Sequence, residues 1–210
     1  MKYKKVSICR FCGNSKLKTY LDLGRHPPSN SFISKKNILN QSKFPLILLL
    51  CNNCSLSQLS IVINHKEIFD EYIYYSSSSK SLVNHYNELV NINIERFKIT
   101  KNDFICDIGS NDGNLLNNFK KYHQVLGITP EKIGKIAIKN GIRTLIRYFD
   151  RNTSKLVLKK FGKAKIITAT NVFAHIENVN LLMKNLLRIL KDDGVFISES
   201  HYLVSLIKTN

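Results

Sequence analysis

The sequence lacks any stretch of apolar residues long enough to span a bilayer. Its longest apolar run, residues 44–50, is far too short for that purpose, and Pro45 interrupts it. The basic N-terminus is not followed by an apolar region either, so we expect no signal peptide. We therefore expect a soluble, cytoplasmic protein without a membrane partner. In that reducing compartment, paired cysteines more often hold a metal ion than form disulfides.

Acidic residues are scarce, since 15 Asp and Glu oppose 32 Lys and Arg and the net charge is +17. This excess invites a nucleic-acid-binding interpretation, which depends on where the charge lies. The basic excess is divided almost evenly between residues 1–100 and 101–210, and no block of five like charges occurs. DNA-binding proteins usually concentrate positive charge on one element or arm. The charge pattern therefore disfavours nucleic acid as a partner and suits a substrate that carries phosphates.

Three parts of the chain differ in pattern. Residues 1–75 are expected to form a small domain. Its first 60 residues are irregular and hold four of the five cysteines. Because its apolar core is so small, we expect a bound metal ion to stabilise it. Residues 76–100 are predicted to contain a connecting helix, because apolar residues from Leu82 onward follow helical spacing. Residues 101–210 form the larger domain.

Short apolar runs alternate with helical patterns along this larger domain. The expected strands cover residues 104–108, 125–128, 143–146, 165–169 and 195–198, and the expected helices cover 114–122, 130–141, 153–160 and 179–190. Asp193-Gly194 is expected to form the turn into the last strand. This alternation predicts an α/β fold with a parallel sheet and right-handed crossovers.

Two CxxC pairs lie in the N-terminal domain, Cys9 with Cys12 and Cys51 with Cys54. Two thiolates at this spacing can grip one face of a tetrahedral metal ion, and two such pairs complete a four-thiolate zinc site. Such a zinc ion has no open coordination position, so it would be structural and not catalytic. The alternative is four buried or redox-active cysteines. Cys106, alone in an expected buried strand, is interpreted as a core residue.

A glycine-containing loop follows the first expected strand of the larger domain, with the sequence Asp-Ile-Gly-Ser-Asn-Asp-Gly at residues 107–113. Doubly wound sheets bind ligands at the carboxyl ends of their strands. Gly109 and Gly113 would let the backbone approach a ligand closely, and Asp107 offers a carboxylate to a cationic amine. The spacing differs from the G-x-G-x-x-G pattern of dinucleotide-binding folds and looks like that of class I methyltransferases. A turn that merely needs glycine is the alternative.

Several motifs together resemble one family. After the four-cysteine region come Tyr-Ile-Tyr-Tyr-Ser-Ser at 72–77, Asp-Ile-Gly-Ser-Asn-Asp-Gly-Asn-Leu-Leu at 107–116, Thr-Asn-Val-Phe-Ala-His at 170–175 and Asp-Gly-Val-Phe-Ile-Ser-Glu at 193–199 with Tyr202-Leu203. Over essentially its whole length the chain resembles the zinc-containing, S-adenosylmethionine-dependent C-methyltransferases that act on nucleotide-linked 4-keto-6-deoxy sugars. The resemblance implies a Rossmann-like class I methyltransferase domain, structural zinc, S-adenosylmethionine as cofactor and a nucleotide-sugar substrate.

The resemblance also implies roles for individual residues. The cofactor site would comprise Asp107, Gly109, Asn111, Asp112, Gly113, Thr129 and Asn171. Tyr74 and His175 would be catalytic residues on the sugar side, although a core aromatic and an ordinary loop histidine are the alternatives. In the implied mechanism a base removes the proton next to the sugar ketone, and the resulting enolate carbon attacks the sulfonium methyl group.

The chain departs from the family pattern in two places. Thr129 stands where an acid normally binds the cofactor's ribose, and Glu131 could substitute only through a shift of the loop. A Tyr-x-Glu-His motif, whose histidine is the expected base, and the last two strands of the sheet do not occur before Asn210. We therefore expect a truncated or split product with little activity alone and a separate C-terminal fragment as partner. The alternatives are a non-catalytic cofactor- or sugar-nucleotide-binding protein and a zinc-ribbon nucleic-acid-binding protein.

Overall fold

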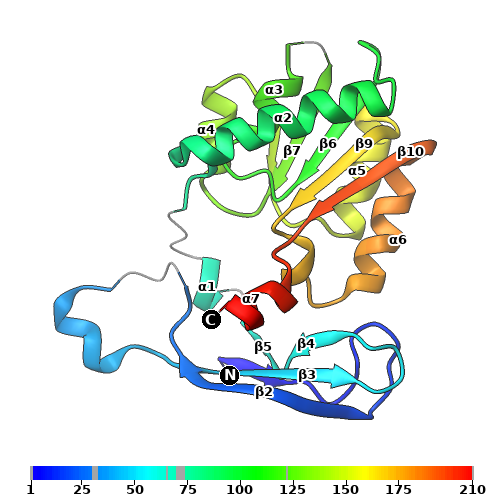
Figure 1. Ribbon diagram of the computed structural model, residues 1–210. Helices are drawn as coiled ribbons and strands as arrows, with labels where there is room; N and C mark the ends of the chain where they lie inside the picture. Colours follow the sequence, from blue (N-terminus) through cyan, green and yellow to red (C-terminus); the bar gives the residue numbers. More distant parts are fainter. Residues whose placement is uncertain (1, 30–32, 65, 70–73, 122, 210) are drawn as a thin grey trace. The chain divides into compact units, whose positions relative to one another are not determined.

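The computed structural model describes residues 2–29, 33–64, 66–69, 74–121 and 123–209, which form two compact units (Figure 1). The first unit contains Met1–Tyr74 and Glu177–Val179, and the second contains Tyr75–Ile176 and Asn180–Asn210. The chain therefore passes from the first unit to the second between Tyr74 and Tyr75, and returns briefly to the first unit at Glu177–Val179.

Two small antiparallel sheets make up most of the first unit. Strand β1 (Tyr3–Lys5) pairs with β5 (Ile61–Ile63), and β3 (Phe44–Cys51) lies between β2 (Leu17–His26) and β4 (Ser57–Leu59). The short helices η1 (Lys35–Asn40) and α1 (Lys66–Phe69) complete the part of this unit that the structure describes.

The expectation that residues 1–60 are irregular is therefore wrong. Strand β3 has the sequence Phe-Pro-Leu-Ile-Leu-Leu-Leu-Cys and is paired along both edges. A continuous apolar run of this kind lacks the alternation that marks a half-buried strand, so a periodicity search does not detect it.

A five-stranded parallel sheet forms the centre of the second unit. Its strands are β6 (Phe104–Ile108), β7 (Gln124–Thr129), β8 (Thr144–Ile146), β9 (Ala164–Thr170) and β10 (Leu190–Glu199), arranged in the order β10-β9-β6-β7-β8. The predicted parallel α/β fold is thus confirmed. The strand order reverses between β6 and β9, and ligands of such sheets bind outside the carboxyl ends of the strands at this reversal.

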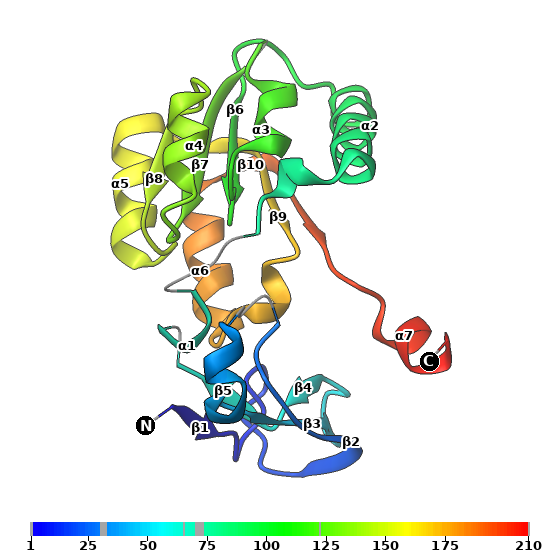
Figure 2. The ribbon, with the colours of Figure 1, turned by 90° about the vertical axis from the view of Figure 1, so that its left-hand side faces the viewer.

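Helices cover both faces of the sheet, as Figure 2 shows for α2 on one side and α5 on the other. Helices α2 (Lys80–Arg96), α3 (Asn114–Phe119) and α4 (Gly134–Lys139) contribute to one core cluster, and α5 (Arg151–Phe161) and α6 (Val179–Ile189) contribute to the other. Residues of β6 alternate between the two, with Ile105 in the first cluster and Cys106 in the second. The short helices η2 (Ser76–Ser78), η3 (Phe173–His175) and α7 (Leu203–Thr209) contribute no residue to either of these two core clusters of the described chain.

Helix α2, expected as a connection between domains, is part of the second unit's core. Its Tyr86 and Val90 side chains are buried in the cluster that also holds Leu115 and Phe119 of α3. Burying a valine side chain stabilises such packing by about 2 kcal/mol. This burial explains why α2 belongs to the sheet that follows it in the chain.

The start of α4 and the start of β10 differ most from the sequence-based expectation. Helix α4 begins at Gly134 and not near Pro130, because residues 131–134 form a turn in which Gly134 N donates to Glu131 O. Strand β10 begins at Leu190 and runs through Asp193-Gly194, where a register shift against β9 replaces the expected turn. Gly141 does end the α4 segment, with a φ of +78°.

Among the described residues, no helix has both the length and the hydropathy needed to cross a membrane.

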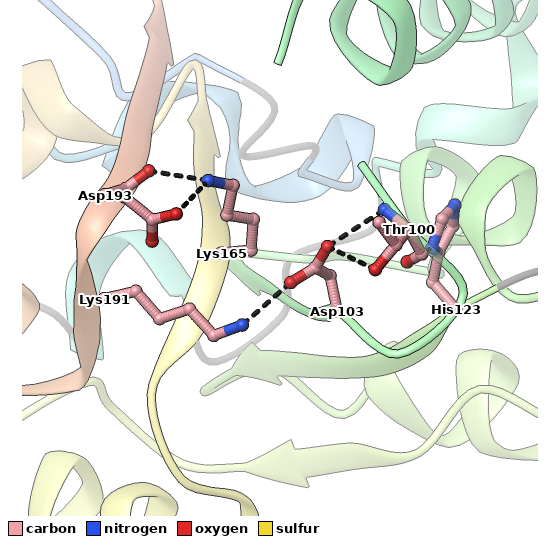
Figure 3. A network of polar contacts seen from close by, with 6 residues as sticks. All are labelled: Thr100, Asp103, His123, Lys165, Lys191 and Asp193. Carbon is pink, nitrogen blue, oxygen red and sulfur yellow. Dashed lines mark hydrogen bonds and ion pairs between the residues drawn. The ribbon is translucent and has the colours of Figure 1, made fainter. Parts of the chain in front are cut away.

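Charged side chains connect the amino ends of β6, β9 and β10 (Figure 3). Asp103 accepts a hydrogen bond from Lys191 Nζ at 2.8 Å and two more from the backbone N–H and hydroxyl of Thr100. Lys165 Nζ contacts the Asp193 carboxylate at 2.7 Å. Burial by itself would raise the pKa of Asp103, but the hydrogen bonds from Lys191 and Thr100 outweigh it and lower the pKa to about 2.

We expect acid to weaken this end of the sheet, and Asp103→Asn to remove the effect. A depressed carboxyl pKa contributes stability that is fully present above the unfolded-state pKa near 4 and is lost as the pH falls toward 2. The shift corresponds to about 2 kcal/mol of stability for the ionised carboxylate. Hydrogen exchange of the β6 and β10 amides at pH 3 and pH 6, in the unaltered chain and in Asp103→Asn, measures this loss of stability within the second unit. Asp192→Asn, which removes only the exposed pair with Lys163, is the control and should leave the exchange unchanged.

Candidate functional site

The four cysteines of the first unit lie on two turns of the same kind. Gly13 N donates to Cys9 O, and Ser55 N donates to Cys51 O, both at 2.9 Å. The residue after each CxxC pair has a left-handed backbone, with φ values of +73° at Gly13 and +61° at Ser55. Gly13 adopts this conformation without steric cost because it has no Cβ, and Ser55 adopts it at greater steric cost.

These turns bring the four thiols together. Cys9 Sγ lies 3.6 Å from Cys54 Sγ, Cys12 Sγ lies 3.6 Å from Cys51 Sγ, and all four sulfur atoms lie within 4.8 Å of one another. Four thiolates around one zinc ion, with Zn–S bonds of about 2.3 Å, stand about 3.8 Å apart. The cluster therefore fits a tetrahedral zinc ion.

Local hydrogen bonds also favour a thiolate in this cluster. N–H groups of Asn14 and Asn53 lower the pKa of Cys12 to about 6, while burial and the neighbouring sulfur atoms raise the pKa of Cys54 to about 12. One thiolate is therefore favoured in the four-thiol cluster by itself, and a bound cation would be needed to hold the others deprotonated. Cys106 is buried in β6 of the other unit, where burial raises the pKa of its thiol, as expected of a core residue.

The glycine loop connects β6 to α3 in the second unit. Gly109 and Gly113 have φ values of +76° and +83°, which L-residues rarely adopt. A Cβ atom on Gly109 would overlap the Cγ2 methyl of Val172, which lies in the segment after β9. The loop therefore needs glycine both for its backbone conformation and for the close approach of the neighbouring segment. Ser110 Oγ in this loop is buried and has no hydrogen-bond partner in the described part of the chain.

Asp107, the predicted partner of a cationic amine, is 2% exposed at the carboxyl end of β6. Its Oδ1 accepts a hydrogen bond of 2.6 Å from the hydroxyl of Thr168 on β9. Burial raises the pKa of Asp107 to about 7, against the lowering effect of the Thr168 bond. A buried carboxylate with so little compensation favours a bound cation nearby.

The other two polar residues of the loop contact the serine run that precedes α2. Asp112 Oδ1 accepts from Ser76 Oγ at 2.5 Å and Asp112 Oδ2 accepts from Ser77 N at 3.1 Å, while Asn111 Oδ1 accepts from Ser76 N at 3.0 Å. Asn114 Nδ2 donates to Ser76 O. The side chains of Asn111 and Asp112 thus bind the protein itself, and the structure leaves their predicted role at the cofactor untested.

Thr129 ends β7 with its side chain completely buried, and its hydroxyl donates to a carboxylate oxygen of Glu131. The sequence suggested that Glu131 could replace the missing acid only after a loop shift. The turn at residues 131–134 already holds the Glu131 carboxylate beside the end of β7. Sequence reasoning missed this because a turn before α4 was not expected.

Polar groups also meet at the carboxyl ends of β9 and β10. His85 Nε2 lies 2.5 Å from Glu199 Oε2, and Tyr86 OH lies 3.0 Å from Thr170 Oγ1. Asn171, a predicted cofactor residue, has a φ of +56° and donates through its backbone N–H to Glu199 O at 2.7 Å. The sequence offered no local signal for the His85–Glu199 pair, because its members are 114 positions apart.

The two predicted catalytic residues lie in different units. His175 is in η3, a few residues beyond β9, and partial desolvation lowers its pKa. Tyr74 is the last residue of the first unit's main segment and is partly exposed. Their catalytic roles stay predictions.

Comparisons with known proteins agree with this architecture. Residues 9–69 match the family described as "Putative zinc binding domain", and residues 84–206 match the family described as "Methyltransferase domain". The C-methyltransferase NovU of Streptomyces niveus is 27% identical over 208 residues, which are 98% of this chain and 50% of NovU. The chain thus spans about half the length of this curated relative.

Solved methyltransferase structures show weaker likeness. The DesVI structure from Streptomyces venezuelae has a TM-score of 0.47 and 13% identity, over 60% of this chain and 53% of DesVI. An S-adenosylmethionine-dependent methyltransferase from Clostridium acetobutylicum has a TM-score of 0.46 and 17% identity, over 55% of this chain and 49% of its own. Because the methyltransferase domain model matches more than half of its residues, the chain belongs to the methyltransferase domain family, with a zinc-binding region in front.

Proposed function

We propose that the second unit binds S-adenosylmethionine and that the chain is part of a C-methyltransferase acting on a nucleotide-linked keto-deoxysugar. The observation that carries this proposal is the match to the methyltransferase domain together with 27% identity to a C-methyltransferase. The sugar substrate rests on the motif resemblance described above, and the net charge of +17 suits its phosphates.

The carboxyl edge of the sheet supports the cofactor part of the proposal. Gly109 and Gly113 would bring the loop backbone close to the ligand, and the buried Asp107 carboxylate would pair with its ammonium group. The Ser110 hydroxyl in the same loop has no hydrogen-bond partner among the described residues and offers one further hydrogen bond. When bound, S-adenosylmethionine supplies an electrophilic methyl group.

The residues around this edge would then orient the two reactants. Glu131, beside the end of β7, would accept hydrogen bonds from the ribose hydroxyls, as acids beyond the second strand do in doubly wound folds. His175 of the second unit would lie on the sugar side, where the acceptor carbon must lose a proton before it forms the new bond. The resemblance implies a catalytic role for Tyr74 of the first unit as well. The zinc ion, with four protein ligands, would maintain the fold of the first unit and take no part in the reaction.

Replacing Glu131 tests the cofactor part of this proposal directly. We expect the unaltered chain to bind S-adenosylhomocysteine, and Glu131→Gln to bind it about tenfold more weakly, because the amide is a poorer acceptor than the carboxylate. The 2′-deoxy analogue of the ligand should lose most of this difference. Isothermal calorimetry measures both ligands on both proteins. Equal affinities in all four titrations would exclude Glu131 from the ribose site, whereas no binding by the unaltered chain would overturn the proposed cofactor.

The substrate part needs a separate assay. Transfer of labelled methyl from S-adenosylmethionine to a nucleotide-linked keto-deoxysugar would be followed with this chain alone and with the C-terminal half of a relative added. We expect turnover only in the mixture, since the resemblance assigns the base to that half. If the mixture transfers no labelled methyl group to a carbon of the keto sugar, the sugar proposal is overturned.

A further inference from the structure

One short segment of the second unit touches the ends of three neighbouring strands. Residues 76–86, which include η2 and the first turns of α2, bind the loop after β6, the last residue of β9 and the last residue of β10. We call these residues the strap. These three strands lie side by side in the sheet, and the order reversal between β6 and β9 falls under the strap.

The first contact of the strap holds the glycine loop. Asp112 is 3% exposed, and its carboxylate accepts from the Ser76 hydroxyl and the Ser77 backbone N–H. The backbone of Ser76 is bonded on both sides, through its N–H to Asn111 and through its O to Asn114. A buried carboxylate that loses a donor destabilises its surroundings strongly, so Ser76 fixes the conformation of this loop.

The second and third contacts hold the ends of β9 and β10. His85 Nε2 donates to Glu199, since an ionised carboxylate can only accept, and Tyr86 OH bonds Thr170. The other Glu199 carboxylate oxygen accepts from Asn171 Nδ2 at 3.4 Å, and the Glu199 carbonyl accepts from Asn171 N. Asn171 is thereby held with a positive φ.

The residue after Asn171 connects these contacts to the glycine loop. The Val172 side chain packs on the α-carbon of Gly109, so closely that no Cβ would fit there. A chain of contacts thus runs from His85 and Glu199 through Asn171 to Val172 and from there to Gly109. The strap therefore acts on the loop from two directions, through Ser76 on Asp112 and through His85 on Asn171.

We propose that the strap is a built-in part of the methyl-donor site, with Ser76 and His85 as positioning residues that set its affinity without touching the ligand. This inference rests on the proposed binding of S-adenosylmethionine at the glycine loop. It extends the site to residues that precede α2 and are far from the loop in sequence.

The experiment compares the affinity of S-adenosylhomocysteine for variants of the complete chain by calorimetry, at a temperature where every variant is folded. We expect Ser76→Ala to weaken binding at least tenfold and His85→Ala about three- to tenfold. His85→Gln retains an N–H donor and should recover most of the loss, a rescue that would not follow if the ring only filled space. Glu199→Ala should resemble His85→Ala, and Glu199→Gln should recover as well.

Two control variants lie outside the strap. Asn91→Ala removes an exposed α2 side chain beyond the strap that donates to Asn87 Oδ1, and Lys163→Ala removes an ion pair between the opposite ends of β9 and β10. Both variants should bind S-adenosylhomocysteine with the affinity of the unaltered chain. If the unaltered chain binds and Ser76→Ala and His85→Ala bind equally well, the strap proposal is wrong while the proposed cofactor stands. If the unaltered chain does not bind, the proposed function itself fails.

Discussion

Replacing Cys51 with serine is expected to abolish zinc binding and unfold the three-stranded sheet of the first unit. Cys51 is completely buried as the last residue of β3, and its thiol belongs to the four-sulfur cluster. A serine hydroxyl is shorter than a cysteine thiolate and binds zinc poorly, so the tetrahedral site loses one of its four metal–ligand bonds. Structural zinc contributes about 10 kcal/mol or more of apparent binding free energy in small domains, which is folding free energy as well. The remaining apolar core of β2, β3 and β4 is too small to replace it.

Metal analysis and amide exchange measure this effect. The unaltered chain should contain one zinc ion, and Cys51→Ser should contain none and lose the protection of the β3 amides. Cys106→Ala is the control, because Cys106 is buried in β6 and lies outside the cluster. Its zinc content should stay at one ion. Full zinc content in Cys51→Ser, or a loss in Cys106→Ala, would show that the ligand set is wrong.

Replacing Gly109 with alanine is expected to weaken S-adenosylhomocysteine binding more than a hundredfold. The φ of +76° costs an L-residue about 1–2 kcal/mol, and the new methyl group would overlap Val172 Cγ2. Forced overlap in a packed region adds about 1–3 kcal/mol, which the loop relieves by moving away from the geometry that binds ligand.

Two further variants separate strain from overlap. Gly162→Ala has a similar φ of +79° but open space around the new atom, so it should lower stability slightly and leave binding unchanged. Gly109→Ala combined with Val172→Ala removes the overlapping methyl groups and should recover part of the affinity. Wild-type affinity in Gly109→Ala would mean that the ligand does not approach this loop.

Local patterns in the sequence determined a large part of the architecture. Strand β6 was expected at the same residues where it occurs, and β7, β9, α5 and α6 were expected to within a few residues. Apolar periodicity and turn residues act over a few positions, so they can be recognised without the rest of the chain. The same holds for the cysteine pairs, since a CxxC spacing itself prescribes how two thiols face one metal ion.

The sequence by itself thus determined the zinc ligand set, the glycine loop and the parallel α/β sheet, while only the tertiary structure decided which side chains support that loop. The bonds of Ser76 to Asp112 and of His85 to Glu199 join residues 36 and 114 positions apart. No short pattern specifies such pairs, because they form only when α2 packs on the sheet and its first two turns meet the ends of β9 and β10. The helix that looked like a connection between two domains became part of the site for this reason: its buried face, Tyr86 and Val90, could be covered only by the sheet that follows it.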